Sequence, residues 1–175
     1  MDIIISSILL SGIELEFTST GREFLMKEAL APLMPLYDYI IIDTPPALGI
    51  LTINAFTASN FIIVPMLSDI FSLQGIAQLY ETVVRVKKYC NPNVSIAGIV
   101  LTKFNKRTIL GREIRGTAEL IPNHLHIHIF DTCIRNSVTA SEAQSVQKNI
   151  FDYAPRNNIA KDYNSLIDEL IARGV

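Results

Sequence analysis

The chain has 175 residues, of which 49% are hydrophobic and 18% are charged, and its net charge is −2. This composition excludes an intrinsically disordered chain and indicates one domain with a substantial core. The small net charge excludes broad attraction to nucleic acid or acidic membranes, so any such contact has to come from a local patch. No apolar run reaches membrane-spanning length. Cys90 and Cys133 do not have the spacing of a metal or redox motif, so we expect them to be reduced thiols of a cytosolic protein.

The first part of the chain predicts alternating strands and helices. "DIIIS" at 2–6 is compatible with a short strand, and "GREFLMKEALAPL" at 21–33 has helical spacing of its apolar residues. "YDYIII" at 37–42 is a nearly continuous apolar run, which is typical of a strand covered on both faces. "LTINAFTAS" at 51–59 predicts a helix, and "NFIIVPM" at 60–66 predicts a second buried strand.

The rest of the chain continues the alternation. Residues 72–90 predict a long amphipathic helix that ends in basic residues, and residues 94–104 predict a third buried strand. Residues 108–121 predict a helix, and residues 159–174 predict a final amphipathic helix that is stopped by Gly174. Buried strands separated by helices indicate an α/β fold with a mostly parallel sheet flanked by helices.

One polar group stands out at the end of the 37–42 run, because Asp43 follows it directly and Thr44, Pro45 and Pro46 come next. Parallel sheets bind ligands outside the carboxyl ends of their strands. A carboxylate at such an end can hold Mg²⁺ directly or through water, and the two prolines stiffen the loop beside it. The alternative interpretation is that Asp43 caps the helix near Gly49 or serves as an ordinary turn residue.

The segment "YDYIIIDTPPALGILTINAFTAS" at 37–59 closely resembles the second nucleotide motif of the ParA/Soj partition ATPases, in the deviant-Walker (MinD-like) group of P-loop proteins. Other segments resemble the same family in the same order. They are "SSILLSGIELEFTSTGREFLMKEAL" at 6–30, "VP" at 64–65, Asp69 with "LQG" at 73–75, "AGIVLTKFNKRTILG" at 97–111, and the carboxyl end from "SEAQS" at 141–145 onward. The resemblance therefore covers almost the whole chain.

This resemblance implies ATP and Mg²⁺ as cofactors and ATP hydrolysis as the activity of the family. It implies that Asp43 lies by the Mg²⁺ and the γ-phosphate as a catalytic residue. It also implies that Thr44, Pro45 and Pro46 form a switch-like loop that senses this phosphate. The nucleotide's adenine base would lie near the loop formed by Lys103, Phe104 and Asn105.

The resemblance also implies non-specific DNA binding by a homodimer in the cytoplasm, at the nucleoid, with a ParB-like adaptor and without a membrane. Arg107 matches a basic position that family members use for DNA, and it lies in the densest basic stretch, formed by Lys106, Arg107, Arg112 and Arg115. Arg135 lies in "IRNSVTASEA", where the family more often has a proline at this position and an arginine at the next, so Arg135 is a further DNA candidate.

The motif GxxxxGK[ST] does not occur in these 175 residues, although the family carries this phosphate loop ahead of the matched region. We therefore expect residues 1–175 to be a single unit, the carboxyl-terminal part of a ParA-type ATPase domain. Its P-loop NTPase-like sheet would lack the N-terminal strand, and the chain alone would not turn over ATP. The alternative is a non-enzymatic remnant that binds only DNA or a partner. Without the N-terminal strand beside it, the 37–42 strand would expose apolar faces unless the chain dimerises or residues 2–6 enter the sheet.

Two further patterns have competing interpretations. His124, His126 and His128 alternate in "HLHIH", so on a strand they would share one face and could bind Zn²⁺, or they could form an exposed polar edge. The final helix could lie on a membrane surface or pack on the sheet. Its acidic residues favour packing, because a surface-seeking helix is rich in bases on its polar face.

Overall fold

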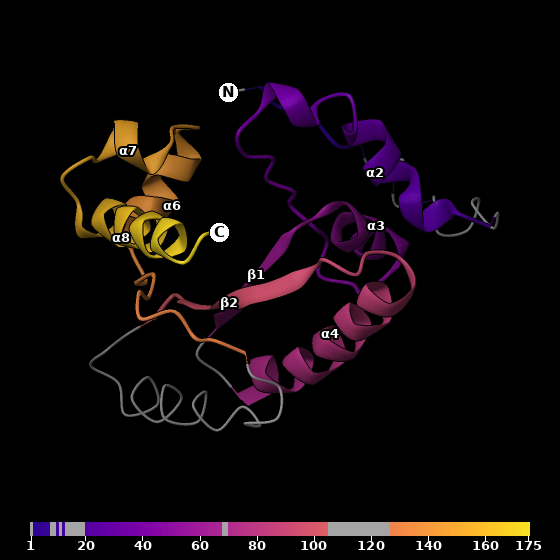
Figure 1. The fold of residues 1–175 in the computed structure, drawn as a ribbon. Coiled ribbons are helices and arrows are strands. Elements are labelled where there is room, and N and C mark those ends of the chain that lie inside the picture. The colour runs from indigo at the N-terminus through magenta and orange to yellow at the C-terminus, as the bar shows by residue number, and fades with distance from the viewer. Residues whose placement is uncertain (1, 8–9, 11, 13–19, 68–69, 105–126) are drawn as a thin grey trace. The chain divides into compact units, whose positions relative to one another are not determined.

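The computed structural model describes residues 2–7, 10, 12, 20–67, 70–104 and 127–175, with the side chains of 70–74 left out (Figure 1). The chain divides into two compact units, which we describe separately. The first comprises Met1–Asn60 and Glu81–Ser95, and the second comprises Phe61–Tyr80 and Ile96–Val175. None of the helices in the described ranges is long and apolar enough to cross a membrane.

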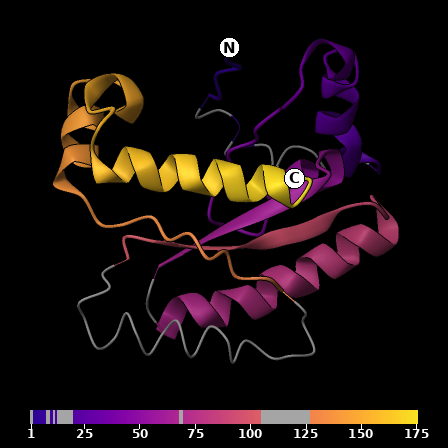
Figure 2. The ribbon, with the colours of Figure 1, turned by 60° about the vertical axis from the view of Figure 1, so that its left-hand side comes forward.

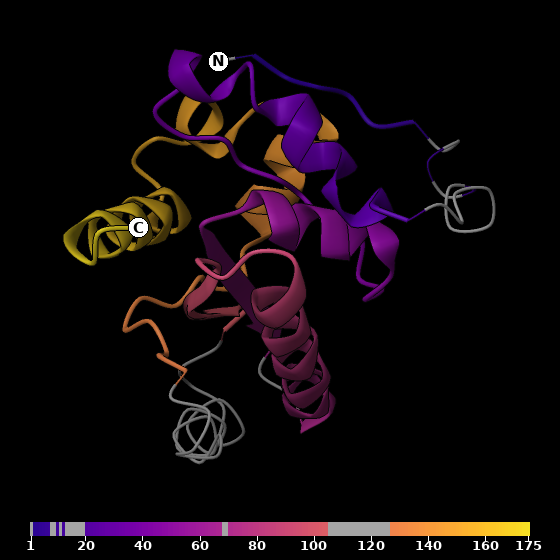
Figure 3. The same cartoon turned by 45° about the vertical axis from the view of Figure 1, so that its right-hand side comes forward.

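The first unit is built from short helices. They are η2 (Arg22–Phe24), α2 (Leu25–Leu30), η3 (Met34–Leu36) and α3 (Ile50–Ala58), and Figure 3 shows them from indigo to purple. Helix α3 supplies most of the buried residues of this unit, including Ala55 and Phe56. The predicted helix at 21–33 is therefore present, but as a 3-10 turn followed by a short α-helix.

Two buried asparagines hold α3 in place. The Asn54 amide nitrogen donates to the Arg22 and Ile50 carbonyls at 2.8 and 3.0 Å, and its oxygen accepts from the Met26 N–H at 3.1 Å. The Asn91 amide donates to carbonyl oxygens at the other end of α3, on Phe56 at 3.2 Å and Ser59 at 2.7 Å. Since buried polar groups are costly unless they are paired, each asparagine ties α3 to one neighbouring segment.

The second unit contains a parallel sheet. Strand β1 (Phe61–Leu67) leads through α4 (Ile70–Tyr89) to β2 (Ser95–Thr102), and β1 and β2 are neighbours. The segment at 129–135 runs parallel to β2 on its other side, through isolated bridges from Ile99 to Ile129 and from Phe104 to Arg135. Phe104 lies five residues after Ile99, whereas Arg135 lies six residues after Ile129. The facing segment therefore carries one extra residue, as in a bulge.

Gly98 explains how closely the third segment approaches β2. A Cβ atom at this position would lie 2.8 Å from Cε2 of Phe130 and 3.0 Å from the carbonyl oxygen of His128. Phe130 is only 1% exposed and cannot swing away. Glycine is therefore the residue that allows β2 and the Phe130 ring to pack at this distance.

After the sheet, the described residues of the second unit form α6 (Val138–Ser145), α7 (Ile150–Tyr153) and α8 (Asn158–Ala172). Ile159, Leu166 and Leu170 of α8 pack on the core formed around Val100 and Phe130, and Figure 2 shows α8 in yellow. The helix ends in a Schellman motif with Gly174 at φ 75°, where the Val175 N–H donates to the Leu170 carbonyl. Packing of the last helix on the sheet is thus confirmed.

Several of the elements predicted from the sequence are confirmed. The predicted helices at 51–59, 72–90 and 159–174 correspond to α3, α4 and α8, and the predicted strands at 60–66 and 94–104 correspond to β1 and β2. The α/β class with a parallel sheet flanked by helices is confirmed as well. The helix predicted at 108–121 lies outside the described residues.

Two predicted strands are wrong. Residues 2–6 and 37–42 form no strand, and their apolar side chains are largely exposed, with Ile41 at 93%. The physical reason is that a strand exists only where a second strand accepts its hydrogen bonds, and the described sheet offers none to either segment. Residues 2–6 therefore do not enter the sheet as a substitute strand. The prediction that β1 is buried on both faces is also wrong, because its residues alternate between buried and exposed.

Candidate functional site

Asp43 lies in an irregular segment that leads from the apolar run to α3. Asp43, Thr44, Pro45 and Pro46 are all exposed, so the Asp43 carboxylate is open to solvent. The prediction that Asp43 ends a buried strand is wrong, for the reason given above. The capping alternative is wrong too, because the residue at the N-cap of α3 is Gly49 and no side chain caps this helix.

A buried threonine of α3, which sequence reasoning missed, is hydrogen-bonded to this loop. Thr52 of α3 is 2% exposed, and its hydroxyl donates to the Ala47 carbonyl oxygen at 2.6 Å. The Pro45 carbonyl oxygen lies 3.5 Å from the same hydroxyl. Since neither proline has an N–H group, the carbonyls of this loop depend on donors from elsewhere. The Asp43–Ala47 loop is therefore attached to the first turn of α3.

The donor set near Asp43 suits Mg²⁺ better than a metal that needs a protein cage. Within the described residues, no three His, Cys, Asp or Glu side chains lie close enough together to hold a metal ion. Mg²⁺ keeps several waters and accepts one or two carboxylates together with phosphate oxygens, so a single exposed carboxylate fits it. Asp43 could fill this role, whereas a structural Zn²⁺ site would need more ligands.

The predicted histidine cluster is described only in part. His124 and His126 lie outside the described residues. His128 is half-buried rather than part of an exposed edge, and its Nε2 atom lies 3.7 Å from Oε1 of Glu169. Its ring also meets the Phe130 ring edge-on, with ring centroids 5.5 Å apart. The described histidine therefore faces an acid of α8.

The residues after β2 occupy two different environments. Lys103 is exposed and has a left-handed backbone, with φ at 49°, which is uncommon for a residue other than glycine. Phe104 is buried, and its N–H donates to the Ile134 carbonyl oxygen at 3.0 Å. The side chain of Phe104 thus belongs to the core, whereas Lys103 forms the turn. Asn105 lies outside the described residues.

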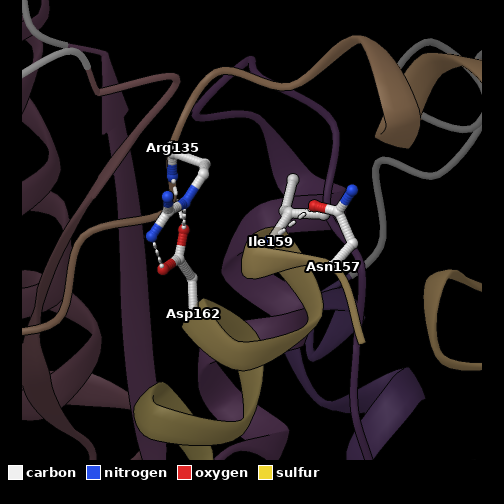
Figure 4. Close-up of polar contacts among 4 residues, drawn as sticks. All are labelled: Arg135, Asn157, Ile159 and Asp162. Atoms are coloured by element: carbon white, nitrogen blue, oxygen red, sulfur yellow. Dashed lines mark hydrogen bonds and ion pairs between the residues drawn. The ribbon is translucent and has the colours of Figure 1, made fainter. Parts of the chain in front are cut away.

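Arg135 is bound by an acid of α8. Its Nε and Nη2 atoms donate to the two oxygens of Asp162 at 2.6 and 2.7 Å, and its backbone N–H donates to the same carboxylate at 3.1 Å (Figure 4). This hydrogen bond to Asp162 raises the pKa of Arg135 above its ordinary value. The guanidinium remains 48% exposed, but its planar fork is occupied.

A second acid of α8 binds the bulge in the third segment of the sheet. The two carboxylate oxygens of Glu169 accept from the N–H groups of Asp131 at 2.8 Å and Thr132 at 2.9 Å. Burial alone would raise the pKa of Glu169, but hydrogen bonds from these two N–H groups and from the side chains of Thr132 and His128 together outweigh burial and hold the pKa below its ordinary value. Asp162 and Glu169 are two helical turns apart, so both reach the same segment from one side of α8.

The structure brings only some of the predicted site residues together. Phe104 and Arg135 are bridge partners in the second unit, and Lys103 precedes them in that unit. Asp43, Thr44 and Pro45 lie in the first unit. The predicted DNA-contacting residues Lys106, Arg107, Arg112 and Arg115 lie outside the described residues.

Comparisons with known proteins agree with this architecture. A family model described as an AAA domain matches residues 1–96. The chain is 39% identical over 175 residues to the sporulation initiation inhibitor protein Soj of Bacillus subtilis, covering 99% of this chain and 68% of Soj. It is 34% identical over 176 residues to the chromosome partitioning protein ParA of Caulobacter vibrioides, covering 99% of this chain and 65% of that protein.

A solved structure is similar as well. Cobyrinic acid a,c-diamide synthase from Mycobacterium smegmatis, with a bound ATP analogue and magnesium, matches with a TM-score of 0.69 and 30% identity. The match covers 75% of this chain and 53% of that one. The chain thus spans about half to two thirds of the length of the proteins that it matches. Identity above 30% over nearly the whole chain shows the family: this chain belongs to the ParA/Soj-type partition ATPases.

Proposed function

We propose that this chain carries part of the nucleotide site and the DNA-binding surface of an ATPase that partitions a plasmid or a chromosome. The observation that carries the proposal is the similarity to Soj and ParA over 99% of the chain. The Asp43 loop supports it, because its carboxylate is exposed and the loop is held by two prolines and by the Thr52 hydroxyl, as a ligand-binding carboxylate requires.

In this proposal, Asp43 places Mg²⁺ beside the γ-phosphate of ATP, and Thr44, Pro45 and Pro46 follow the state of that phosphate. When bound, Mg²⁺ offsets the negative charge that develops as the phosphoryl group is transferred. Lys103, Phe104 and Asn105 lie near the adenine base. The left-handed backbone of Lys103 supports a defined turn at this point, because such conformations often mark ligand-binding loops.

The DNA surface is proposed to centre on the basic stretch from Lys106 to Arg115, acting in an ATP-dependent homodimer that a ParB-like adaptor stimulates in the cytoplasm at the nucleoid. We rank Arg135 behind this stretch. Its guanidinium would first have to exchange the Asp162 carboxylate for a DNA phosphate, and that carboxylate is mostly buried and well aligned.

The test uses two proteins, namely the 175-residue chain and a version in which a Soj phosphate-loop segment precedes it. The version with the loop should bind ATP only with Mg²⁺ present and should hydrolyse it. The 175-residue chain should release no phosphate, because no GxxxxGK[ST] loop occurs in it. Failure of the loop-bearing version to bind ATP would overturn the proposed function. Phosphate release by the shorter chain that survives repurification and disappears in Asp43→Ala would overturn the second expectation.

A further inference from the structure

We infer that Thr52 is a positioning residue for the Asp43 loop. In this inference, which rests on the proposed function of that loop, the buried hydroxyl fixes the path of the chain between Asp43 and α3. The carboxylate of Asp43 is thereby presented in one place before any ligand arrives. Thr52 itself touches neither metal nor nucleotide in this role.

The position of Thr52 in α3 makes its hydrogen bond unusual. A threonine inside a helix commonly donates to the carbonyl four residues earlier. Thr57 does so in the same helix, since its hydroxyl donates to the Ile53 carbonyl oxygen at 2.8 Å. Thr52 is the third residue of α3 and instead donates to Ala47, which lies before the helix begins. Its hydroxyl therefore joins the helix to the loop.

Among the described residues, few other contacts could hold the loop from Asp43 to Ala47 in place, which makes the Thr52 hydrogen bond important. Pro45 and Pro46 have fixed φ angles but no N–H groups, so this part of the chain makes fewer backbone hydrogen bonds than an ordinary turn. Residues 43–47 are exposed, so their side chains provide no buried anchor. Thr52 is almost fully buried, which leaves its hydroxyl little room to move away from the Ala47 carbonyl oxygen.

Thr57 provides a matched control, because it is also a buried threonine of α3 that donates to a backbone carbonyl. NMR order parameters of the Ala47 and Leu48 amides are measured in the 175-residue chain, in Thr52→Val, Thr52→Ser and Thr57→Val. In Thr52→Val they should fall from about 0.85 to below about 0.6. Thr52→Ser and Thr57→Val should leave them unchanged. Unchanged values in Thr52→Val, or an equal fall in Thr57→Val, would overturn the inference.

The catalytic consequence is measured in the version that carries a phosphate loop. Thr52→Val should lower kcat for ATP about fivefold, which is the factor that one hydrogen bond is worth, with KM little changed and with recovery in Thr52→Ser. An unchanged kcat beside a mobile loop would make Thr52 a purely structural residue and overturn its positioning role. If the parent protein binds no ATP at all, the proposed function fails, and the order parameters still decide whether Thr52 holds the loop.

Discussion

Replacing Glu169 by glutamine should destabilise the second unit and make its stability less dependent on pH. Each carboxylate oxygen of Glu169 accepts one backbone N–H, from Asp131 and from Thr132. A glutamine of the same shape keeps one acceptor oxygen and places an NH₂ group against the other N–H. One of the two backbone N–H groups therefore faces an NH₂ group instead of an acceptor oxygen, beside a side chain that is only 19% exposed.

The expected cost follows from the kind of bond that is lost. Hydrogen bonds to a charged group contribute about 1.5–3 kcal/mol each, and the exposed fraction of Glu169 is small enough that solvent removes only part of this. With a urea m-value of about 2 kcal/mol per M, a loss of about 2 kcal/mol lowers the unfolding midpoint by about 1 M. Circular dichroism during urea titration at pH 7 measures this shift.

The pH dependence has a definite sign. The folded protein holds the pKa of Glu169 below its ordinary value, so the stabilisation is fully present above the unfolded pKa of about 4.3. It is lost as the pH falls through the folded pKa, because a protonated carboxyl no longer accepts at both oxygens. The difference between wild type and Glu169→Gln should therefore shrink below about pH 4.

Two controls make this experiment decisive. Asp168→Asn removes the neighbouring acid, which is exposed, and should leave the midpoint within error. His128→Asn removes the imidazole that lies 3.7 Å from Glu169, so it separates the contribution of this neighbour from that of the two backbone N–H groups. An equal loss in Asp168→Asn, or a Glu169→Gln cost that stays constant from pH 7 to pH 3, would refute the reasoning.

Three further predictions concern the site and the core. In the version with a phosphate loop, Asp43→Ala should abolish ATP turnover and leave the circular dichroism spectrum unchanged, because the carboxylate helps to place Mg²⁺; near-normal kcat would show that it has no such role. In the same protein, Arg107→Ala should flatten the slope of log DNA affinity against log salt by about 0.9 without affecting nucleotide binding, and an unchanged slope would exclude this residue. Gly98→Ala should cost about 1–3 kcal/mol in urea unfolding, because the added Cβ would lie 2.8 Å from the Phe130 ring. Gly75→Ala is its control, since open space surrounds that position in α4 and the change should be neutral or stabilising.

The part of the fold that could be predicted from the sequence is the part that local interactions determine. Helices α3, α4 and α8 make their hydrogen bonds within a few residues, so apolar spacing was enough to predict them. Strand β2 could be predicted because its run of apolar residues is typical of a strand that is buried on both faces. The order of residues around the two prolines and the family resemblance singled out Asp43, whose role stays a prediction.

Tertiary structure decided whatever depends on a partner that is distant in the sequence. The apolar runs at 2–6 and 37–42 read as strands, yet neither forms one, because strand formation depends on a neighbour as well as on composition.

The same reason explains the contacts of site residues that sequence reasoning could not find. Arg135 is a DNA candidate from the sequence, and only the fold shows that Asp162, 27 residues later, binds its guanidinium. Glu169 reaches N–H groups 37 and 38 residues earlier, and nothing in its local sequence indicates them. Thr52 has the composition of an ordinary helical threonine, and only the fold shows that its hydroxyl leaves the helix to hold the Asp43 loop.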